Sequence, residues 1–243
     1  MTRMTLALTS ALILAAATSN PASLLGQAVT VDNGEFRVSI GGQVVGVETF
    51  QILRSAAGGP EWVIARGVVE VNLGAGLDSL TSYMDVQGES PIVTAYQVVR
   101  TAEETTKVRV NLLAPRYLSI TESAAGRREK EIRAEAGVLF LEDRVAHQYY
   151  FLAQAIAAGM TRVPAIIPLE GRRVDLALTV EPESTLLIGG RALPVRRVIL
   201  GTGDQERRVW LDLQGRVLRV EVPSIGYQAV RTEPPSGTTP SPA

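Results

Sequence analysis

The residues RRVWLDLQGRVLRVEVPSIGYQAVR, at positions 207–231, form the most specific stretch of the 243-residue chain. Asp212 is suited to open a tight turn. Gly215 is suited to close it, because glycine adopts a left-handed backbone conformation without steric cost. We expect strands to run up to Trp210 and away from the turn, with a further pair of strands after the break at Pro223. This stretch therefore predicts antiparallel hairpins at the C-terminal end of the domain.

The same alternation of apolar and polar residues continues upstream, from Glu35 onward. A strand with one apolar face and one polar face is typical of an antiparallel sheet rather than a buried parallel one. The apolar positions are Phe36, Val38 and Ile40; Val69, Val71 and Leu73; Val108, Val110 and Leu112; Leu176, Leu178 and Val180; and Leu218, Val220 and Val222.

Two Gly-Gly pairs, Gly41-Gly42 and Gly189-Gly190, each lie between strand-like runs. A two-residue Gly-Gly turn matches the twist of paired strands, so both sites predict β-hairpins. The surroundings of the two sites also match, since an isoleucine precedes each pair and a valine follows it at the same distance. A faint internal repeat would explain this match, but convergent hairpin chemistry is the simpler interpretation.

One helix is predicted in the middle of the chain, from about Asp143 to Ala158. Asp143 is a suitable N-cap and Gly159 a suitable C-cap. The charge-rich residues 123–137 are expected to form an exposed loop or a short helix. Strands, a helix and more strands indicate an α+β domain in which the helix covers a sheet face. The apolar stripe of the helix consists of Val145, Tyr149, Leu152 and Ile156.

The N-terminal residues 1–28 have the features of a secretory signal peptide, with Arg3 before a short uncharged run and small residues near Ala28. Cleavage is expected before Val29, with an earlier site after the Ala15–Ala17 run as the alternative. A buried N-terminal helix is the other interpretation of this segment. The run is too short to span a bilayer, so we expect a periplasmic or secreted protein with no membrane span after cleavage.

The remaining chain is expected to form one domain over residues 29–232, because no linker divides it. Residues 233–243 are rich in proline, serine, threonine and glycine and are predicted to be a disordered tail.

The composition argues against several classes of function. The chain has 24 Lys and Arg residues against 25 Asp and Glu residues, no cysteine and one histidine. The near-zero net charge gives no reason to expect a nucleic-acid partner. The absence of cysteine and the single histidine argue against zinc sites and cysteine nucleophiles. No phosphate-binding, dinucleotide-binding or nucleophile-elbow motif is present, so no cofactor and no metal is predicted.

Asp143 and His147 are the best catalytic candidates, because they lie four residues apart on the predicted helix and a carboxylate can orient an imidazole as a general base. An ordinary exposed ion pair is the favoured interpretation, since no motif places a serine nucleophile. Four arginine pairs could clamp a phosphate or carboxylate, but solvated strand or loop charges are the commoner explanation. These pairs are Arg127-Arg128, Arg172-Arg173, Arg196-Arg197 and Arg207-Arg208.

The C-terminal run resembles the closing W-x-D-x-x-G-x-[VL]-x-[RK] hairpin of exported lipoprotein carriers, the outer-membrane lipoprotein localisation factors and related uncharacterised families. Trp210, Asp212 and Gly215 are the residues that match. The resemblance implies a single, strongly curved antiparallel sheet, a half-barrel whose concave apolar face is covered by the helix and holds acyl chains. The chain differs from these carriers in its Pro/Ser/Thr tail and its lack of cysteine.

Three functions follow as hypotheses. The first is a non-enzymatic protein that binds a lipid, an acyl chain or another apolar ligand in a groove between sheet and helix. The second is a structural or interaction module with a closed core that docks an envelope protein. The third is an enzyme based on Asp143 and His147. For the first, the expected ligand contacts are Val38, Val71, Tyr96, Tyr149, Leu152 and Ile156.

Overall fold

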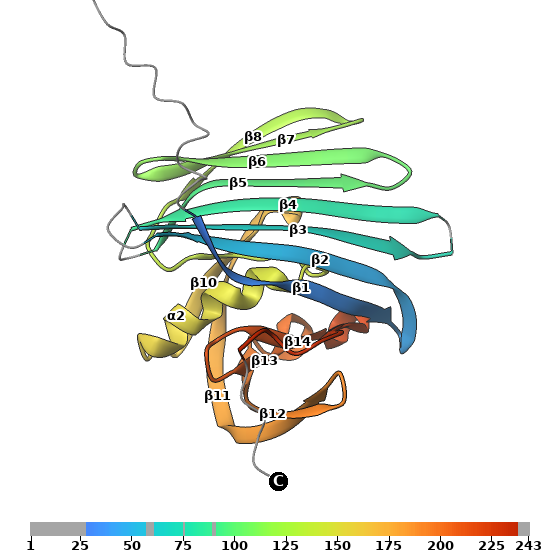
Figure 1. The fold of residues 1–243 in the computed structure, drawn as a ribbon. Coiled ribbons are helices and arrows are strands. Elements are labelled where there is room, and N and C mark those ends of the chain that lie inside the picture. The colour runs from blue at the N-terminus through green and yellow to red at the C-terminus, as the bar shows by residue number, and fades with distance from the viewer. Residues whose placement is uncertain (1–27, 57–60, 75, 89–90, 238–243) are drawn as a thin grey trace, which may run out of the picture.

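A computed structural model describes residues 28–56, 61–74, 76–88 and 91–237 (Figure 1). Fifteen strands form one sheet in the order β8-β7-β6-β5-β4-β3-β2-β1-β15-β14-β13-β12-β11-β10-β9. The strands are β1 (Ala28–Ile40), β2 (Gln43–Ser55), β3 (Trp62–Asn72), β4 (Leu77–Gln87), β5 (Ile92–Thr101), β6 (Thr105–Leu113), β7 (Arg116–Ser123), β8 (Gly126–Arg133), β9 (Leu139–Phe140), β10 (Arg162–Ile167), β11 (Arg172–Ile188), β12 (Arg191–Leu200), β13 (Arg207–Asp212), β14 (Val217–Val222) and β15 (Tyr227–Arg231).

The sheet consists of two meanders joined at β1 and β15. Within each meander every strand pairs with its neighbour in sequence, and all these pairs are antiparallel except β9 with β10. At the junction, Arg231 on β15 donates to Asp32 on β1 at 2.6 Å, and both side chains are buried. The predicted antiparallel sheet is confirmed, but its strand number and its order were not predicted.

The predicted α+β half-barrel covered by one main helix is wrong. The helical segment contains only η1 (His147–Phe151), a 3₁₀ turn, followed by α2 (Leu152–Ala157). This short helix lies in the hollow of the curled sheet, with strands on more than one side of it (Figure 1). A sheet of this size curls and needs its interior filled by side chains. Residues 138–152 are mostly buried and provide this filling.

The predicted start of the helix at Asp143 is also wrong. Asp143 forms an ion pair with Arg207 instead of capping the helix. The carboxylate of Glu48 on β2 accepts hydrogen bonds from the backbone N–H groups of Ala146 at 2.7 Å and His147 at 2.8 Å. A contact from the sheet thus determines where the helical segment begins. Its end agrees with the prediction, because Gly159 has a φ of +66° just after Ala158.

The predicted hairpin turns are confirmed. Both glycines of each Gly-Gly pair have positive φ, and the flanking residues Ile40 and Gln43 pair directly across the first turn. In the C-terminal hairpin, Oδ1 of Asp212 accepts from the N–H groups of Gln214 and Arg216, and Gly215 has a φ of +81°. Short-range turn chemistry is therefore read correctly from the sequence.

Residues 123–137 are not an exposed loop or short helix, because they contain β8. This edge strand has the sequence GRREKEIR, and only Ile132 of its side chains is buried. An edge strand that is charged on both faces lacks the alternation that identifies a half-buried strand, and its charges discourage further pairing. Nζ of Lys130 on β8 donates to the carbonyl oxygen of Gly171 at 2.6 Å, so this edge approaches the β10–β11 turn.

The predicted signal peptide falls almost wholly on residues 1–27, which lie outside the described residues; Ala28 begins β1. At the other end, the predicted tail begins with residues 233–237, where Pro235 is buried and the carbonyl oxygen of Ser236 accepts from Arg216 at 2.7 Å. Residues 238–243 lie outside the described residues. Among the described helices, none has the length and apolarity needed to cross a membrane.

Candidate functional site

An apolar cavity of about 110 Å³ lies between α2 and strands β4 and β5. We call it the α2–β4 cavity. Gln154 of α2 and Ala158, the residue after α2, are exposed at its rim. It is lined by Met84, Val86, Pro91, Val93, Gly137, Val138, Leu139, Phe140, Phe151, Gln154, Ala155, Ala158 and Met160.

The chemistry of the α2–β4 cavity favours an apolar group. Among the described residues that line it, Gln154 is the one with a polar side chain, and it lies at the exposed rim. Met84 and Met160 supply flexible, polarisable side chains that adapt to the shape of an occupant. A larger hollow of about 640 Å³, between the β3–β4 and β5–β6 turns, is lined by residues such as Asp78, Arg100 and Glu103 and suits water better than an apolar group.

The six side chains predicted to contact a ligand do not line the α2–β4 cavity. Val38, Val71, Tyr96, Tyr149 and Leu152 are buried in the main hydrophobic core. Ile156 lines a different cavity, on the other side of α2. The structure therefore places five of them in the core and packs the sixth, Ile156, against the edge of that core.

His147 does not interact with Asp143 as predicted. Its Nδ1 lies 2.7 Å from Oε1 of Glu48, and its Nε2 lies 3.3 Å from Oγ of Ser82. In the tautomer with its hydrogen on Nδ1, the ring donates a hydrogen bond to the carboxylate and accepts one from the Ser82 hydroxyl at Nε2. The ring also stacks on Phe50, with 6.0 Å between the ring centroids.

This serine–histidine–glutamate arrangement has the order of groups found in nucleophilic hydrolases, a nucleophile, a base and a group that orients the base. The side chains of Ser82, His147 and Glu48 are 3%, 1% and 0% exposed, respectively. Ser82 points to the inner face, like the buried Leu80 and Met84 on the same strand. The hydroxyl is therefore almost wholly buried in this conformation, and the three groups fasten the inner segment to β2 and β4.

A second buried polar cluster surrounds Glu142. Oε1 of Glu142 accepts from the hydroxyl of Tyr96 at 3.3 Å and from the N–H of Leu169 at 3.1 Å. Gln148 donates to the Tyr96 oxygen at 3.0 Å and accepts from the backbone N–H of Glu142 at 2.7 Å. Burial raises the pKa of Glu142 from 4.5 to about 8. The cluster holds the chain directly after Leu139 and Phe140, two residues that line the α2–β4 cavity.

The arginine pairs do not act as two-residue clamps. Most of their members are neutralised one by one by acidic neighbours, while Arg128 and Arg196 form no ion pair with the described residues. In the described part of the chain, no group of three or more His, Asp or Glu side chains is arranged to bind a metal ion. The ion pairs are Arg127–Glu129, Arg172–Glu170, Arg173–Glu135, Arg197–Glu181, Arg207–Asp143 and Arg208–Glu206.

Sequence reasoning missed the residues that line the α2–β4 cavity and the partners of His147. Glu48 and Ser82 are 99 and 65 positions away from His147 in the chain. No local spacing connects them. One signal was available for the cavity: outside the expected signal peptide the sequence has two methionines, Met84 and Met160, and both line it.

No protein-family model matches this chain, and no curated protein matches it. Among solved structures, its fold is similar to the crystal structure of a β-barrel-like protein of a domain of unknown function, DUF1849, from Brucella abortus. The TM-score is 0.55, the sequence identity is 8%, and the match covers 84% of this chain and 96% of the other. At this identity the likeness concerns the fold alone. The chain thus has a β-barrel-like antiparallel fold.

Proposed function

We propose that this protein binds a lipid or another apolar ligand without catalysis and holds one apolar end of the ligand in the α2–β4 cavity. The observation that carries the proposal is the cavity itself, an apolar space with a single polar side chain, Gln154, at its rim. Protein interiors are normally packed without such space. An apolar cavity that stays dry is a favourable site for an apolar group.

The size of the cavity limits what enters it. A cavity of about 150 Å³ accommodates benzene in another protein, and this one is about 110 Å³. It fits the terminal few carbons of an acyl chain or a similar compact apolar group. The remainder of a longer ligand would leave past Gln154 and Ala158, which are exposed.

Two features of the sequence support an extracytoplasmic lipid or apolar ligand. The signal-peptide-like residues 1–28 favour a place in the periplasm or outside the cell. The resemblance of the Trp210–Gly215 hairpin to lipoprotein carriers favours the same ligand class, because those carriers hold acyl chains.

Methionine methyl NMR tests the proposal directly. The chain has four methionines, and two of them, Met1 and Met4, belong to the predicted signal peptide. The other two, Met84 and Met160, line the cavity. In protein labelled with ¹³C at the methionine methyl groups, titration with octanol, a neutral apolar probe, should shift both signals saturably.

A cavity-filling variant separates binding from surface adsorption. Ala155→Leu places three more carbons in the cavity and should abolish the shifts while the protein stays folded by circular dichroism. Ala192→Leu, the same change at an exposed position of β12, is the matched control and should bind as the wild type does. The proposal is contradicted if the methionine methyl signals of the wild-type protein do not shift on titration with octanol.

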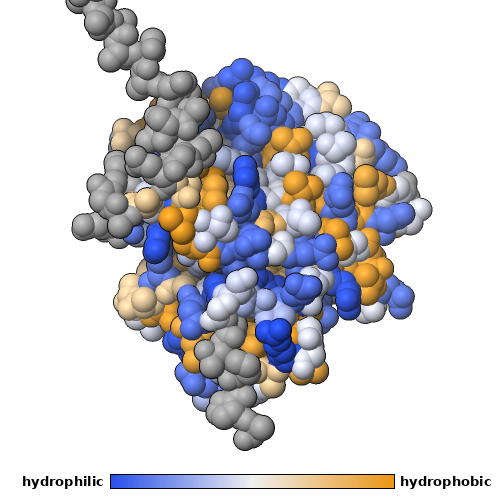
Figure 2. All heavy atoms as spheres, in the orientation of Figure 1, coloured by the Kyte–Doolittle hydropathy of each residue, from blue (hydrophilic) through white to orange (hydrophobic). Residues whose placement is uncertain are grey.

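The alternative function, an interaction module for an envelope protein, is a distinct outcome of this experiment. On the face seen in Figure 2, hydrophobic side chains are interspersed with hydrophilic ones. The interaction module is favoured if the protein does not bind apolar probes but forms a stable complex with an envelope protein.

A further inference from the structure

A second cavity, of about 280 Å³, lies on the other side of α2. It is bounded by Ala153, Ile156 and Ala157 of α2 and, across from them, by Arg196 of β12 and residues 211–215 of the β13–β14 hairpin. We call it the Arg196 cavity. Its size is close to the lower end of the range for small-molecule pockets, about 300 Å³.

Arg196 is a charged side chain on the inner face of the sheet. It pairs directly with Leu211 of β13, and two residues further along the same strand Val198 pairs with Val209. Leu211, Val198 and Val209 all belong to the buried main core. Because side chains two apart on a strand share a face, the guanidinium group of Arg196 lies on the side of the sheet that packs against α2.

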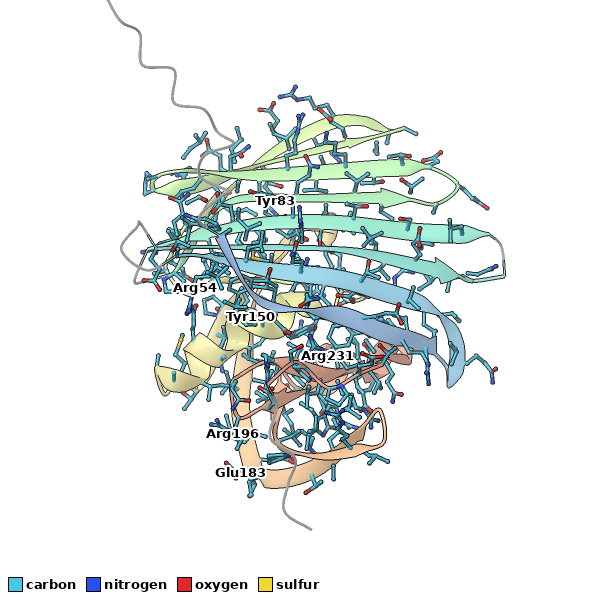
Figure 3. All side chains as sticks on the ribbon, viewed as in Figure 1. Arg54, Tyr83, Tyr150, Glu183, Arg196 and Arg231 are labelled. Atoms are coloured by element: carbon cyan, nitrogen blue, oxygen red, sulfur yellow. The ribbon has the colours of Figure 1, made fainter. Side chains whose placement is uncertain are left out.

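Arg196 has no hydrogen-bond or ion-pair partner among the described residues. Its neighbour Arg197 points to the opposite face, where Nε lies 2.5 Å from Oε2 of Glu181. Glu183 is opposite Arg196 in the β11–β12 register, and both are labelled in Figure 3 below α2, but no ion pair joins them. An arginine that is partly buried at a cavity, with no acidic partner, is an open site for an anion.

Asp212, the acidic residue that lines the cavity, is already neutralised. Oδ2 of Asp212 accepts from Nε of Arg216 at 2.8 Å, and Oδ1 accepts from two backbone N–H groups. The apolar part of the cavity lining consists mainly of Ile156, Leu211 and Leu213. One unpaired positive charge beside an apolar wall matches a ligand with one negative charge and a short hydrocarbon chain.

We propose that the Arg196 cavity binds a short-chain fatty acid or a similar amphipathic monocarboxylate. The carboxylate accepts hydrogen bonds from the Arg196 guanidinium group, and the chain lies against Ile156, Leu211 and Leu213. This site is separate from the α2–β4 cavity and does not depend on the function proposed for that cavity.

Calorimetric titration of the full chain with octanoate tests the proposal. Octanoate should bind saturably to the wild type, and Arg196→Gln should weaken binding about 10- to 100-fold, because a charge-assisted hydrogen bond is lost. Arg191→Gln, the same loss of charge at an exposed position of β12, is the matched control and should bind as the wild type does. Glu183→Gln should bind octanoate at least as tightly, because it removes the acidic group opposite Arg196.

Further probes distinguish the ligand classes. Octylamine should not bind at this site, and ¹³C labelling of isoleucine δ1 methyl groups should show the Ile156 signal shifting with octanoate. Wild-type protein that is folded but does not bind octanoate, or an Arg196→Gln variant that binds it unchanged, would overturn the proposal. A peptide with a free C-terminal carboxylate that outcompetes octanoate, with its amidated form inactive, would overturn it in favour of a protein C-terminus as the ligand.

Discussion

Gly67 on β3 faces the ring of His147 so closely that a methyl group at Gly67 would lie 2.6 Å from Cε1 and 2.7 Å from Nδ1. Glycine is therefore needed at this position for space rather than for backbone freedom, since Gly67 does not have a positive φ. The missing side chain lets the imidazole approach the sheet between Glu48 and Ser82. This contact joins the inner segment to the wall of the curled sheet.

Gly67→Ala should lower the free energy of unfolding by about 1–3 kcal/mol, because it overpacks a filled site. Urea denaturation measures the loss. The same substitution in a His147→Ala background should cost less, because the imidazole that it meets is gone. Equal costs in both backgrounds would show that the glycine is not needed for the His147 contact.

Ser82 should resist a fluorophosphonate probe that labels activated serines, because its hydroxyl is 3% exposed and directed at His147 on the inner face. Mass spectrometry of the intact protein and its peptides checks this. Ser82→Ala should instead lower stability by about 1–3 kcal/mol, because Nε2 of His147 loses its buried partner. Stoichiometric labelling at Ser82 would contradict a purely structural role for Ser82, His147 and Glu48 and would support a hydrolytic one.

Glu142 should make the stability of the protein fall as the pH rises. Burial raises the pKa of its carboxyl group from 4.5 to about 8. Between these values the folded state keeps a proton that the unfolded state has released, so the stabilisation present below pH 4.5 is lost progressively up to about pH 8.

Urea denaturation across this pH range compares three proteins. Glu142→Gln removes the titrating group, keeps an oxygen to accept from Tyr96 and Leu169, and should flatten the curve. Glu131→Gln changes an exposed carboxylate on β8 and should keep the wild-type slope. If the slope survives in Glu142→Gln, another group causes it.

Gly215→Ala should destabilise the protein through backbone strain and through a steric clash. The same substitution at Gly203, where only the strain applies, separates the two effects. Gly215 has a φ of +81°, and a Cβ there would lie 2.6 Å from Cβ of Ala153 on α2. Gly203 has a φ of +58° with nothing within 4 Å of the added carbon. Gly203→Ala should therefore cost only the backbone strain, about 1–2 kcal/mol, and Gly215→Ala should cost more. Similar melting temperatures for the two variants would argue against the contact between the hairpin and the helix.

The sequence alone determined the local parts of the fold. Period-two alternation at positions such as Phe36 and Val38 predicted antiparallel strands, and Gly41-Gly42 and Asp212–Gly215 predicted their turns, because these features depend on residues a few positions apart. Where a strand has no buried face, as in β8, the same signal disappears and the strand was missed.

Only the tertiary structure decided what the strands enclose. The sheet curls around residues 141–152, so the apolar stripe predicted to cover a sheet is interior filling instead. Glu48, Ser82 and His147 meet because β2, β4 and η1 are brought together by strand register over 65 to 99 positions. Both cavities beside α2, and the side of the sheet on which Arg196 lies, follow from that register and from the curl of the sheet. Such long-range geometry depends on the sum of many pairings, which no local pattern in the sequence records.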